Sequence, residues 1–390
     1  MALVTNFAHN GITKEIKRAP MALGPLSDHI VAVVGTAPNA DAAAFPLNTP
    51  VRVSTEELTA KLDTTDSGEG FLVHFCDMTR QQANVPIYVI RVDEGADEAA
   101  TIANIIGGVD GTTGQKKGIK AIYNCFEKPT IIAAPGYSKD IGVAQALGAV
   151  SLDINCLFTV DLVGAKATDV AAKGDALGND DTGFGNCVAI AHTAKYNNHY
   201  GDLVMPGSVV ATGRIAAEKP WMGPGHRGVA ISGVDVYFEY NPLSNATDGS
   251  LLNKHGICYF GNTSAGGWSL IGNRTLTGRF ISHVGLEHAL IRKLTQALEK
   301  GLGRNLTKTF MEQEVGKVNN WLESLIAEEV VMPGSSCYLH PEKNTVDNYK
   351  SGRWFIVVEY GAYGVNENTV IELYESDGVV KAFLENVLAA

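Results

Sequence analysis

Two glycine-rich stretches have spacings that suggest phosphate binding. Gly223–Gly228, "GPGHRG", matches G-x-G-x-x-G literally, but a dinucleotide site needs a strand before this motif and a helix that starts inside it. Here "EKPWM" precedes the glycines and a strand-like run follows them. Gly107–Gly118 lacks the G-K-[ST] ending that places a lysine on the phosphates. Both stretches are therefore predicted to be loops, and no cofactor is expected.

The residues that usually perform acid–base or nucleophilic chemistry are scattered. The closest histidine pairs do not have H-E-x-x-H or another ligand spacing, so no metal is expected. Ser138 follows a predicted strand, but nothing in the sequence marks a histidine partner for it. The adjacent Asp180 and Asp181 lie in a glycine-rich loop and are interpreted as solvated. No catalytic residue is predicted, although an α/β enzyme that uses the Ser138 loop or the "GPGHRG" loop stays open as an alternative.

A single arginine stands out in the apolar run "GWSLIGNRTLTG". Arg274, between Asn273 and Thr275, needs a partner, because an unpaired buried charge is strongly unfavourable. That partner is an anion, a nucleic-acid phosphate, or another part of a protein.

The composition narrows these choices. The 390 residues carry a net charge of −11, which argues against nucleic-acid binding by a basic surface. The six cysteines form no C-x-x-C pair, so buried free thiols in a reducing compartment are expected. The start of the chain lacks the apolar core of a signal peptide, and no apolar run approaches the roughly 20 residues of a membrane span. We therefore expect folding in a cytoplasm without membrane insertion.

The middle of the chain alternates between strand and helix patterns. The predicted strands cover 30–34, 85–92, 129–136 and 155–162, with a helix over 140–150. Strand, helix and strand at this spacing indicate βαβ units and parallel pairing. A short strand-like stretch at 2–9 precedes this region without a neighbouring sheet to join.

The last third of the chain has a different pattern. Leucines every fourth residue over 286–298 predict one amphipathic helix, and the apolar positions of 315–325 predict a second. The runs 352–360 and 368–374 are predicted to form an antiparallel strand pair, and a short helix over 379–388 closes the chain. This part is α+β, whereas the middle is α/β.

Several stretches, in order from Ile30 to Gly278, resemble the contractile tail sheath proteins of bacteriophages and R-type pyocins. The pair "FPLNTPV" and "GNRTL" is quite specific, and "PWMGPGHRGVAISGV" lies between them. The resemblance implies a structural polymer, not an enzyme: stacked hexameric rings around a tail tube, which shorten on a baseplate signal and drive the tube through a cell envelope. It implies contacts with copies of the chain, the tube protein, the baseplate and the tail terminator, in a virion tail assembled in the bacterial cytoplasm.

The resemblance also implies a fold: an α/β outer domain plus an α+β inner domain built from both chain ends, with extended N- and C-terminal arms. The expected boundaries are 1–24 for the N-terminal arm and linker, 25–266 for the outer domain and 267–390 for the inner domain and C-terminal arm. In such proteins, the arms add strands to sheets of neighbouring subunits. Leu3, Val4 and Phe7 are expected in the linking arm, and Trp354, Ile356 and Val358 in the receiving strand.

The resemblance implies roles for two sets of polar residues. Asn273, Arg274 and Thr275 are expected to anchor the inner domain, with Arg274 bonded to backbone carbonyls or a carboxylate, because a guanidinium offers five donors. An exchange of partners during contraction, or anion binding, are the alternatives for Arg274. Arg292, Lys293 and Lys300, on the polar face of the first helix, are expected either to meet an acidic tube wall or to form a solvated helix face. The family's proline-rich turn between its last two strands is missing from residues 361–369, which leaves that hairpin's geometry open.

Overall fold

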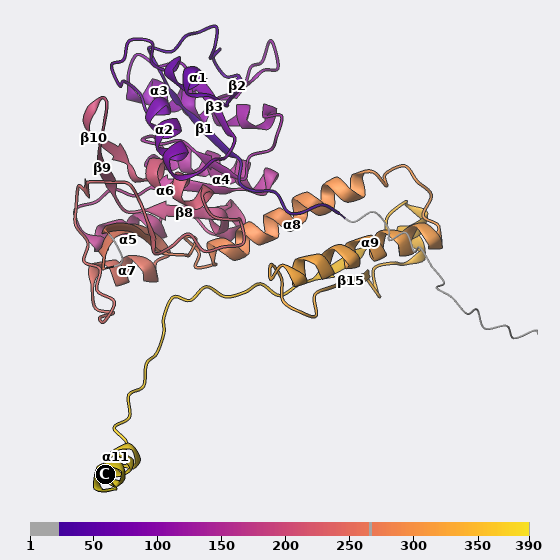
Figure 1. Cartoon of the computed structure of the whole chain (residues 1–390). Coiled ribbons are helices and arrows are strands. Elements are labelled where there is room, and N and C mark those ends of the chain that lie inside the picture. The colour runs from indigo at the N-terminus through magenta and orange to yellow at the C-terminus, as the bar shows by residue number, and fades with distance from the viewer. Residues whose placement is uncertain (1–22, 265–266, 390) are drawn as a thin grey trace, which may run out of the picture.

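A nine-stranded sheet forms the body of the protein. The computed structural model describes residues 23–264 and 267–389 (Figure 1). In sheet order the strands are β11 (Arg227–Gly228), β14 (Gly267–Ile271), β13 (Ile257–Thr263), β8 (Cys187–Ile190), β7 (Leu157–Asp161), β6 (Ile131–Ala133), β1 (Val31–Thr36), β3 (Ile87–Val92) and β2 (Pro50–Val53). Six neighbouring strands, from β13 to β3, are parallel. β2 and β14 run antiparallel to them, and β11 pairs antiparallel with β14.

Helices cover both faces of this sheet. Val31 and Val33 of β1 pack on one face against α2 (Leu72–Gln82) and α6 (Gly207–Ala216). Ala32 and Val34 belong to the core on the other face, because successive strand residues point to opposite sides. The helices on that face are α3 (Glu98–Ile106), α4 (Ile141–Ile154), α5 (Ala167–Asp175) and α7 (Asp248–Lys254) with the 3-10 turn η1 (Gly118–Asn124). The α/β class predicted for the middle of the chain is confirmed.

The body also contains several shorter elements. They are α1 (Glu56–Ala60), the hairpin β4 (Gly108–Val109) and β5 (Lys116–Lys117), the 3-10 turns η2 (Asp180–Thr182) and η3 (Phe184–Asn186), and a three-stranded sheet of β10 (Gly201–Pro206), β9 (Thr193–Asn198) and β12 (Gly233–Val234).

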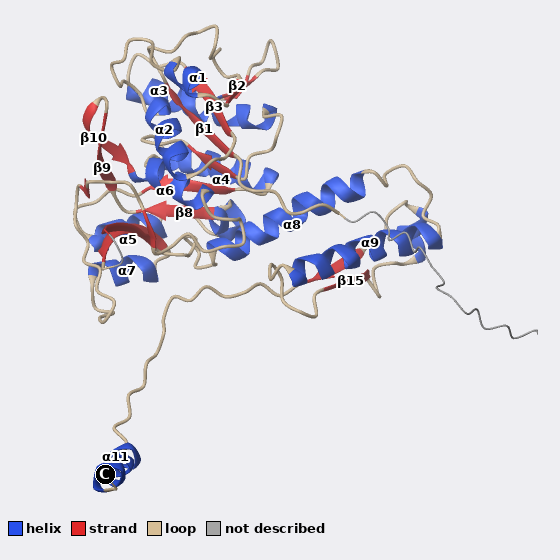
Figure 2. Ribbon diagram, viewed as in Figure 1, coloured by secondary structure: helices blue, strands red, loops and turns tan. Residues whose placement is uncertain are grey.

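A helical hairpin projects from the body and has a core of its own. It consists of α8 (Ile281–Glu299) and α9 (Lys308–Ala327), with α10 (Val346–Lys350) and the two-stranded sheet of β15 (Ser336–Leu339) and β16 (Ile356–Glu359) (Figure 2). Trp321 is fully buried in this core, and Leu26 from the start of the described chain packs into the same cluster. Burial of one leucine contributes about 2 kcal/mol. Segments from both ends of the described chain therefore build this unit.

The chain leaves the hairpin unit in an extended course. Residues 360–376 contain no helix or strand, and α11 (Asp377–Leu388) stands apart from the rest of the protein in Figure 1. Every residue of α11 is exposed. The closing helix was predicted over 379–388, and the structure confirms it with two more residues at its start.

Two sequence predictions need correction. The strand partner of β16 is β15, not residues 368–374, which are coil. The four residues of β15 are too few to show a strand pattern, whereas 368–374 have strand-forming side chains but no neighbouring strand within the described chain. The boundary expected between 266 and 267 separates β13 from β14, which pair with each other. Since Leu270 and Ile271 belong to the sheet's core, the body ends near residue 280.

Candidate subunit-linking interface

The sheet of β15 and β16 has one closed edge and one open edge. Asn319 of α9 lies beside the outer edge of β15, where its Nδ2 donates to the carbonyl of Cys337 at 2.8 Å. Its Oδ1 accepts the N–H of Cys337 at 2.7 Å. The side-chain amide thus satisfies both backbone groups of Cys337, as a paired strand would, and an added strand cannot bind there without displacing it.

The same contact shows which backbone groups of β16 point outward. Cys337 faces Val358 in the antiparallel register. Because Cys337 directs its N–H and carbonyl away from β16, Val358 directs its own away from β15, as both residues do in a non-hydrogen-bonded pair. Ile356, two residues earlier, faces the same way. Within the described residues we find no partner for these outward groups. Such an edge is a template for another strand.

A strand-forming segment near the C-terminus also has no partner within the described chain. Residues 368–374, "NTVIELY", are exposed coil; 77% of Val370 and 91% of Leu373 are open to solvent. A run of exposed apolar side chains marks an interaction segment. The linking residues expected near the N-terminus, Leu3, Val4 and Phe7, lie outside the described residues, so their role stays a prediction.

Arg274 fixes the base of this C-terminal segment. Its Nη2 lies 2.8 Å from Oε2 of Glu367, and its Nη1 donates to the carbonyl of Gly278 at 2.7 Å. The guanidinium carbon also lies 4.1 Å from the centre of the Phe280 ring. The Arg274 side chain is 38% exposed, so the ion pair contributes at most about 1 kcal/mol. Its main effect is positional, because Glu367 directly precedes the exposed segment.

Asn273 and Thr275 hold the turn that presents Arg274. Oδ1 of Asn273 accepts the N–H of Gly225 at 2.8 Å, and the N–H of Thr275 donates to the carbonyl of Arg279 at 2.8 Å. A Cβ atom on Gly225 would lie 2.5 Å from the amide nitrogen of Asn273, so a larger residue there would displace the Asn273 side chain. Gly225 of "GPGHRG" thus allows a close contact between two loops.

Arg292, like Arg274, bonds to backbone carbonyls. From α8 it donates to the carbonyls of Lys128, Pro129 and Asn155 at 2.8, 2.6 and 2.7 Å. A fourth contact reaches the carbonyl of Ile154 at 3.2 Å. The donors of Arg292 join α8 to the body, and its contact with a tail tube stays a prediction. Lys300, at the end of α8, is exposed, and Lys293 is partly buried.

Two buried histidines lie near Arg292. Because of them, we expect the folded protein to be less stable at acidic pH. Burial, reinforced by the charge of Arg292, lowers the pKa of both His29 and His288 to about 3. Because the folded-state pKa values are depressed, the unfolded chain takes up protons first, so stability is lost as pH falls from about 6.5 towards 3. When the pH falls from 7 to 5, each histidine should lower the free energy of unfolding by about 2 kcal/mol.

Urea unfolding of the His288→Gln variant at these two pH values tests this. We expect the stability difference between pH 7 and pH 5 to shrink by about 2 kcal/mol relative to the parent chain. The His199→Gln variant, which alters an exposed imidazole, is the control. An equal pH dependence in the parent and His288→Gln would contradict the assignment.

The residues considered for enzymatic chemistry serve the fold. Ser138 is fully buried and donates to Oδ2 of Asp161 at 2.8 Å, and the hydroxyl of Ser208 donates to the same oxygen at 2.7 Å. Burial raises the pKa of Asp161 despite these bonds. The network joins β7 to the loop after β6 and to α6. In residues 23–264 and 267–389 we find no group of three or more acidic, histidine or cysteine side chains arranged for a metal.

No helix in the described parts of the chain has both the length and the apolar character needed to cross a membrane.

In sequence, the chain is similar to a phage tail sheath protein. No family model matches the chain. It is 22% identical to the tail sheath protein of Escherichia phage P2, an alignment that covers 93% of this chain and 94% of that protein.

In fold, the chain is similar to solved structures of contractile sheaths. The helical sheath of the anti-feeding prophage in its contracted state matches with a TM-score of 0.69 at 16% identity, over 95% of this chain and 100% of that chain. The contracted PVC sheath complex of an extracellular contractile injection system gives 0.70 at 12% identity, over 96% and 99%. The predicted resemblance to contractile sheath proteins is confirmed, and these similar proteins are structural proteins, not enzymes.

Proposed function

We propose that this chain is the structural subunit of a contractile tail sheath and that it polymerises by exchange of β-strands. The observation that carries the proposal is the resemblance to a tail sheath protein over more than nine tenths of both chains. The open edge of β16 and the unpaired segment 368–374 support the mode of assembly, because the edge lacks a partner strand and the segment lacks a sheet to join.

In the polymer, residues 368–374 of one subunit pair with β16 of a neighbour. Main-chain hydrogen bonds give such a contact its strength without requiring particular side chains. The N-terminal residues 2–9 add a second link. Arg274 and Glu367 fix the point from which the C-terminal segment leaves its own subunit. The subunits can therefore rotate as rigid bodies while the segments keep them joined, and two packings of one subunit store the energy that contraction releases.

The remaining contacts follow from this arrangement. The hairpin unit faces a tail tube, and the α/β body forms the outer surface. Lys300, Lys293 and Arg292 are the basic residues of α8 expected at the tube. The ends of the sheath meet a baseplate and a tail terminator in the virion tail, after assembly in the bacterial cytoplasm. Neither nucleic acid nor membrane insertion takes part.

Negative-stain electron microscopy of the concentrated protein tests the proposal. We expect the full chain to form tubes and a chain of residues 1–367 to form none. The truncated chain should keep its melting temperature, because the segment that it lacks is exposed. Compact particles from the full chain at every concentration and salt would contradict a sheath and favour the enzyme alternative.

A further inference from the structure

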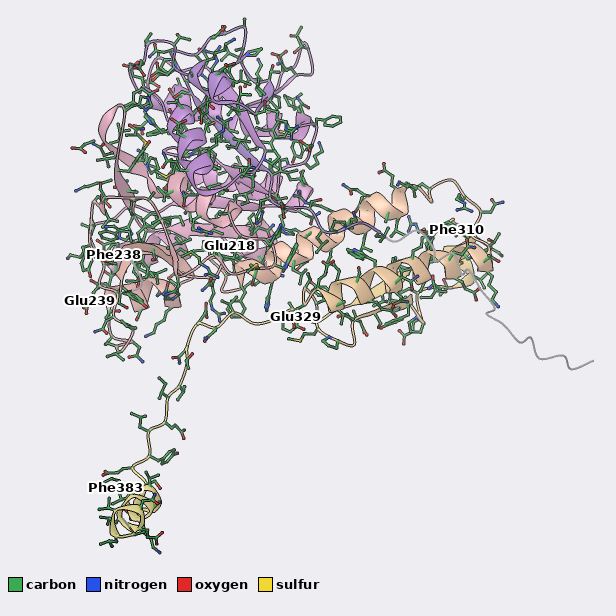
Figure 3. All side chains as sticks on the ribbon, viewed as in Figure 1. Glu218, Phe238, Glu239, Phe310, Glu329 and Phe383 are labelled. Carbon is green, nitrogen blue, oxygen red and sulfur yellow. The ribbon has the colours of Figure 1, made fainter. Side chains whose placement is uncertain are left out.

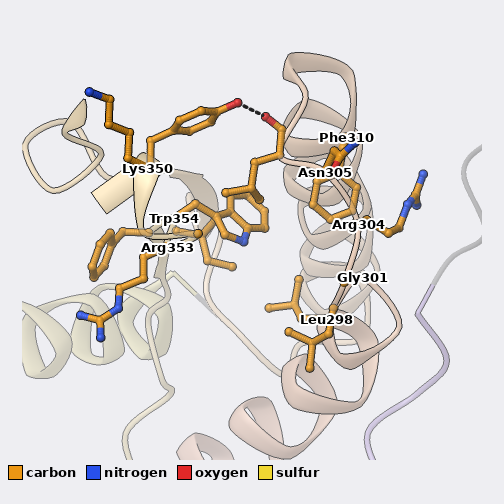
Figure 4. A pocket seen from close by; sticks show the side chains of 15 residues that line it. Leu298, Gly301, Arg304, Asn305, Phe310, Lys350, Arg353 and Trp354 are labelled. Carbon is orange, nitrogen blue, oxygen red and sulfur yellow. Dashed lines mark hydrogen bonds between the residues drawn. The ribbon is translucent and has the colours of Figure 1, made fainter. Parts of the chain in front are cut away.

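A groove at the far end of the hairpin unit has an apolar floor and a basic rim. It encloses about 910 Å³ between the end of α8, the start of α9 and the segment from α10 to β16. Figure 4 shows Leu298, Phe310 and Trp354 on the inside and basic side chains around them. The basic residues are Arg304, Lys350 and Arg353, and no carboxylate lines the groove. Since the whole chain has a net charge of −11, this rim is a local exception.

The helix α11 has the complementary character. Val379, Val380, Phe383 and Val387 lie within about 100° of one another around a helix of 3.6 residues per turn, and 50–70% of each is exposed. The stretch that carries this helix is acidic, with four carboxylates, Glu372, Glu375, Asp377 and Glu385, against a single lysine, Lys381. Within the described residues nothing covers the apolar face of α11.

The helix does not reach the groove of its own subunit in this conformation. Figure 3 shows Phe383 on α11 and Phe310 at the groove on opposite sides of the protein. In this conformation, an occupant of the groove has to come from another chain.

Strand direction connects the two features. A neighbour's segment 368–374 that pairs antiparallel with β16 ends beside Ile356, where the groove begins. Only Glu375 and Ser376 then separate the added strand from α11. Parallel pairing would bring the acidic helix to Glu359 instead. The groove therefore favours the antiparallel direction, which is also slightly more stable per residue.

We propose that α11 of one subunit docks, apolar face inward, in the groove around Trp354 of the subunit that receives its strand. This rests on the proposed function and adds a second contact to the strand. Burial of the apolar side chains supplies the affinity, and the basic rim selects an acidic helix. The helix also prevents the added strand from sliding, because a shift by one residue would move the helix out of the groove.

Chemical cross-linking in assembled protein tests this contact. One preparation carries Leu302→Cys at the groove rim, where the leucine is 78% exposed, and the other carries Val387→Cys on the apolar face of α11. The six native cysteines are buried, so a short bismaleimide should react mainly at the new thiols. The two preparations are mixed, assembled and analysed on denaturing gels. We expect about ten-fold more cross-linked dimer than with either control, because a specific contact raises the local concentration.

The controls change one position at a time. Glu385→Cys replaces Val387→Cys and lies on the opposite face of α11, and Leu243→Cys replaces Leu302→Cys on the body, where Leu243 is 96% exposed. Tubes with equal cross-linking for all pairs would overturn the docking and leave the sheath proposal intact. Cross-linking within one chain that carries both cysteines, at a dilution where no tubes form, would make the subunit's own helix the occupant and also overturn it. If the parent chain forms no tubes, the sheath proposal and this inference fail together.

Discussion

A subunit in which Val358 is replaced by proline is expected to remain folded and to lose assembly. Proline lacks the N–H that an added strand would use, and in Val358 this group points away from β15, so the bonds inside the subunit remain. Proline is tolerated in edge strands for this reason. Loss of one ladder bond and the bulk of the ring should raise the concentration needed for assembly about ten-fold or more.

Sedimentation of tubes across a concentration series measures this effect. The Val358→Thr variant is the matched control, because it keeps the N–H and a β-branched side chain of similar volume, and it should assemble like the parent. Circular dichroism and thermal melting establish that Val358→Pro is folded. Assembly of Val358→Pro at the parent's concentration would show that the edge of β16 does not receive a strand.

The Arg292→Met variant is expected to lose about 3 kcal/mol of stability, because the carbonyls that Arg292 now binds lose their donors where α8 meets the body. Methionine fills much of the same space, so the loss reports hydrogen bonds more than packing. Urea unfolding gives the value from the midpoint and slope.

Two further variants separate charge from geometry. Lys300→Met removes a positive charge from the end of the same helix, where the side chain is exposed, and should change stability little. Arg292→Lys keeps the charge but has a single nitrogen, which cannot reach all the carbonyls, and should fall between the parent and Arg292→Met. If Arg292→Met and Lys300→Met were equally stable, Arg292 would not be the anchor of α8.

Much of the fold can be predicted from the sequence because buried elements are rich in apolar residues. The strands around Val33, Val89 and Phe158 are mostly apolar, and the helix with Leu286 and Leu290 has a clear apolar stripe, so the sequence predicts each at nearly its observed place. The pairing of β15 with β16 could not be predicted in this way. Residues 336–339 carry too little signal, and the better strand pattern at 368–374 has no partner within the described chain.

The candidate interface was less accessible to sequence analysis. The resemblance indicates Trp354, Ile356 and Val358 as the receiving strand. The residue that closes the opposite edge of the sheet, Asn319, is one of several polar residues on α9 and has no distinguishing pattern. Arg274 is conspicuous in the sequence because it interrupts an apolar run. Arg292 lies among other polar residues of α8, and only the fold shows that the carbonyls it binds come from two separate loops of the body.

A cryo-electron microscopy map of the assembled tubes, at a resolution that separates strands, would show whether neighbouring subunits exchange strands. We expect a third strand beside β16, with the side chains of residues 368–374 of a neighbouring subunit, and Asn319 still bonded to Cys337 at the closed edge. An empty edge at β16, with subunits joined only through their α/β bodies, would contradict this exchange.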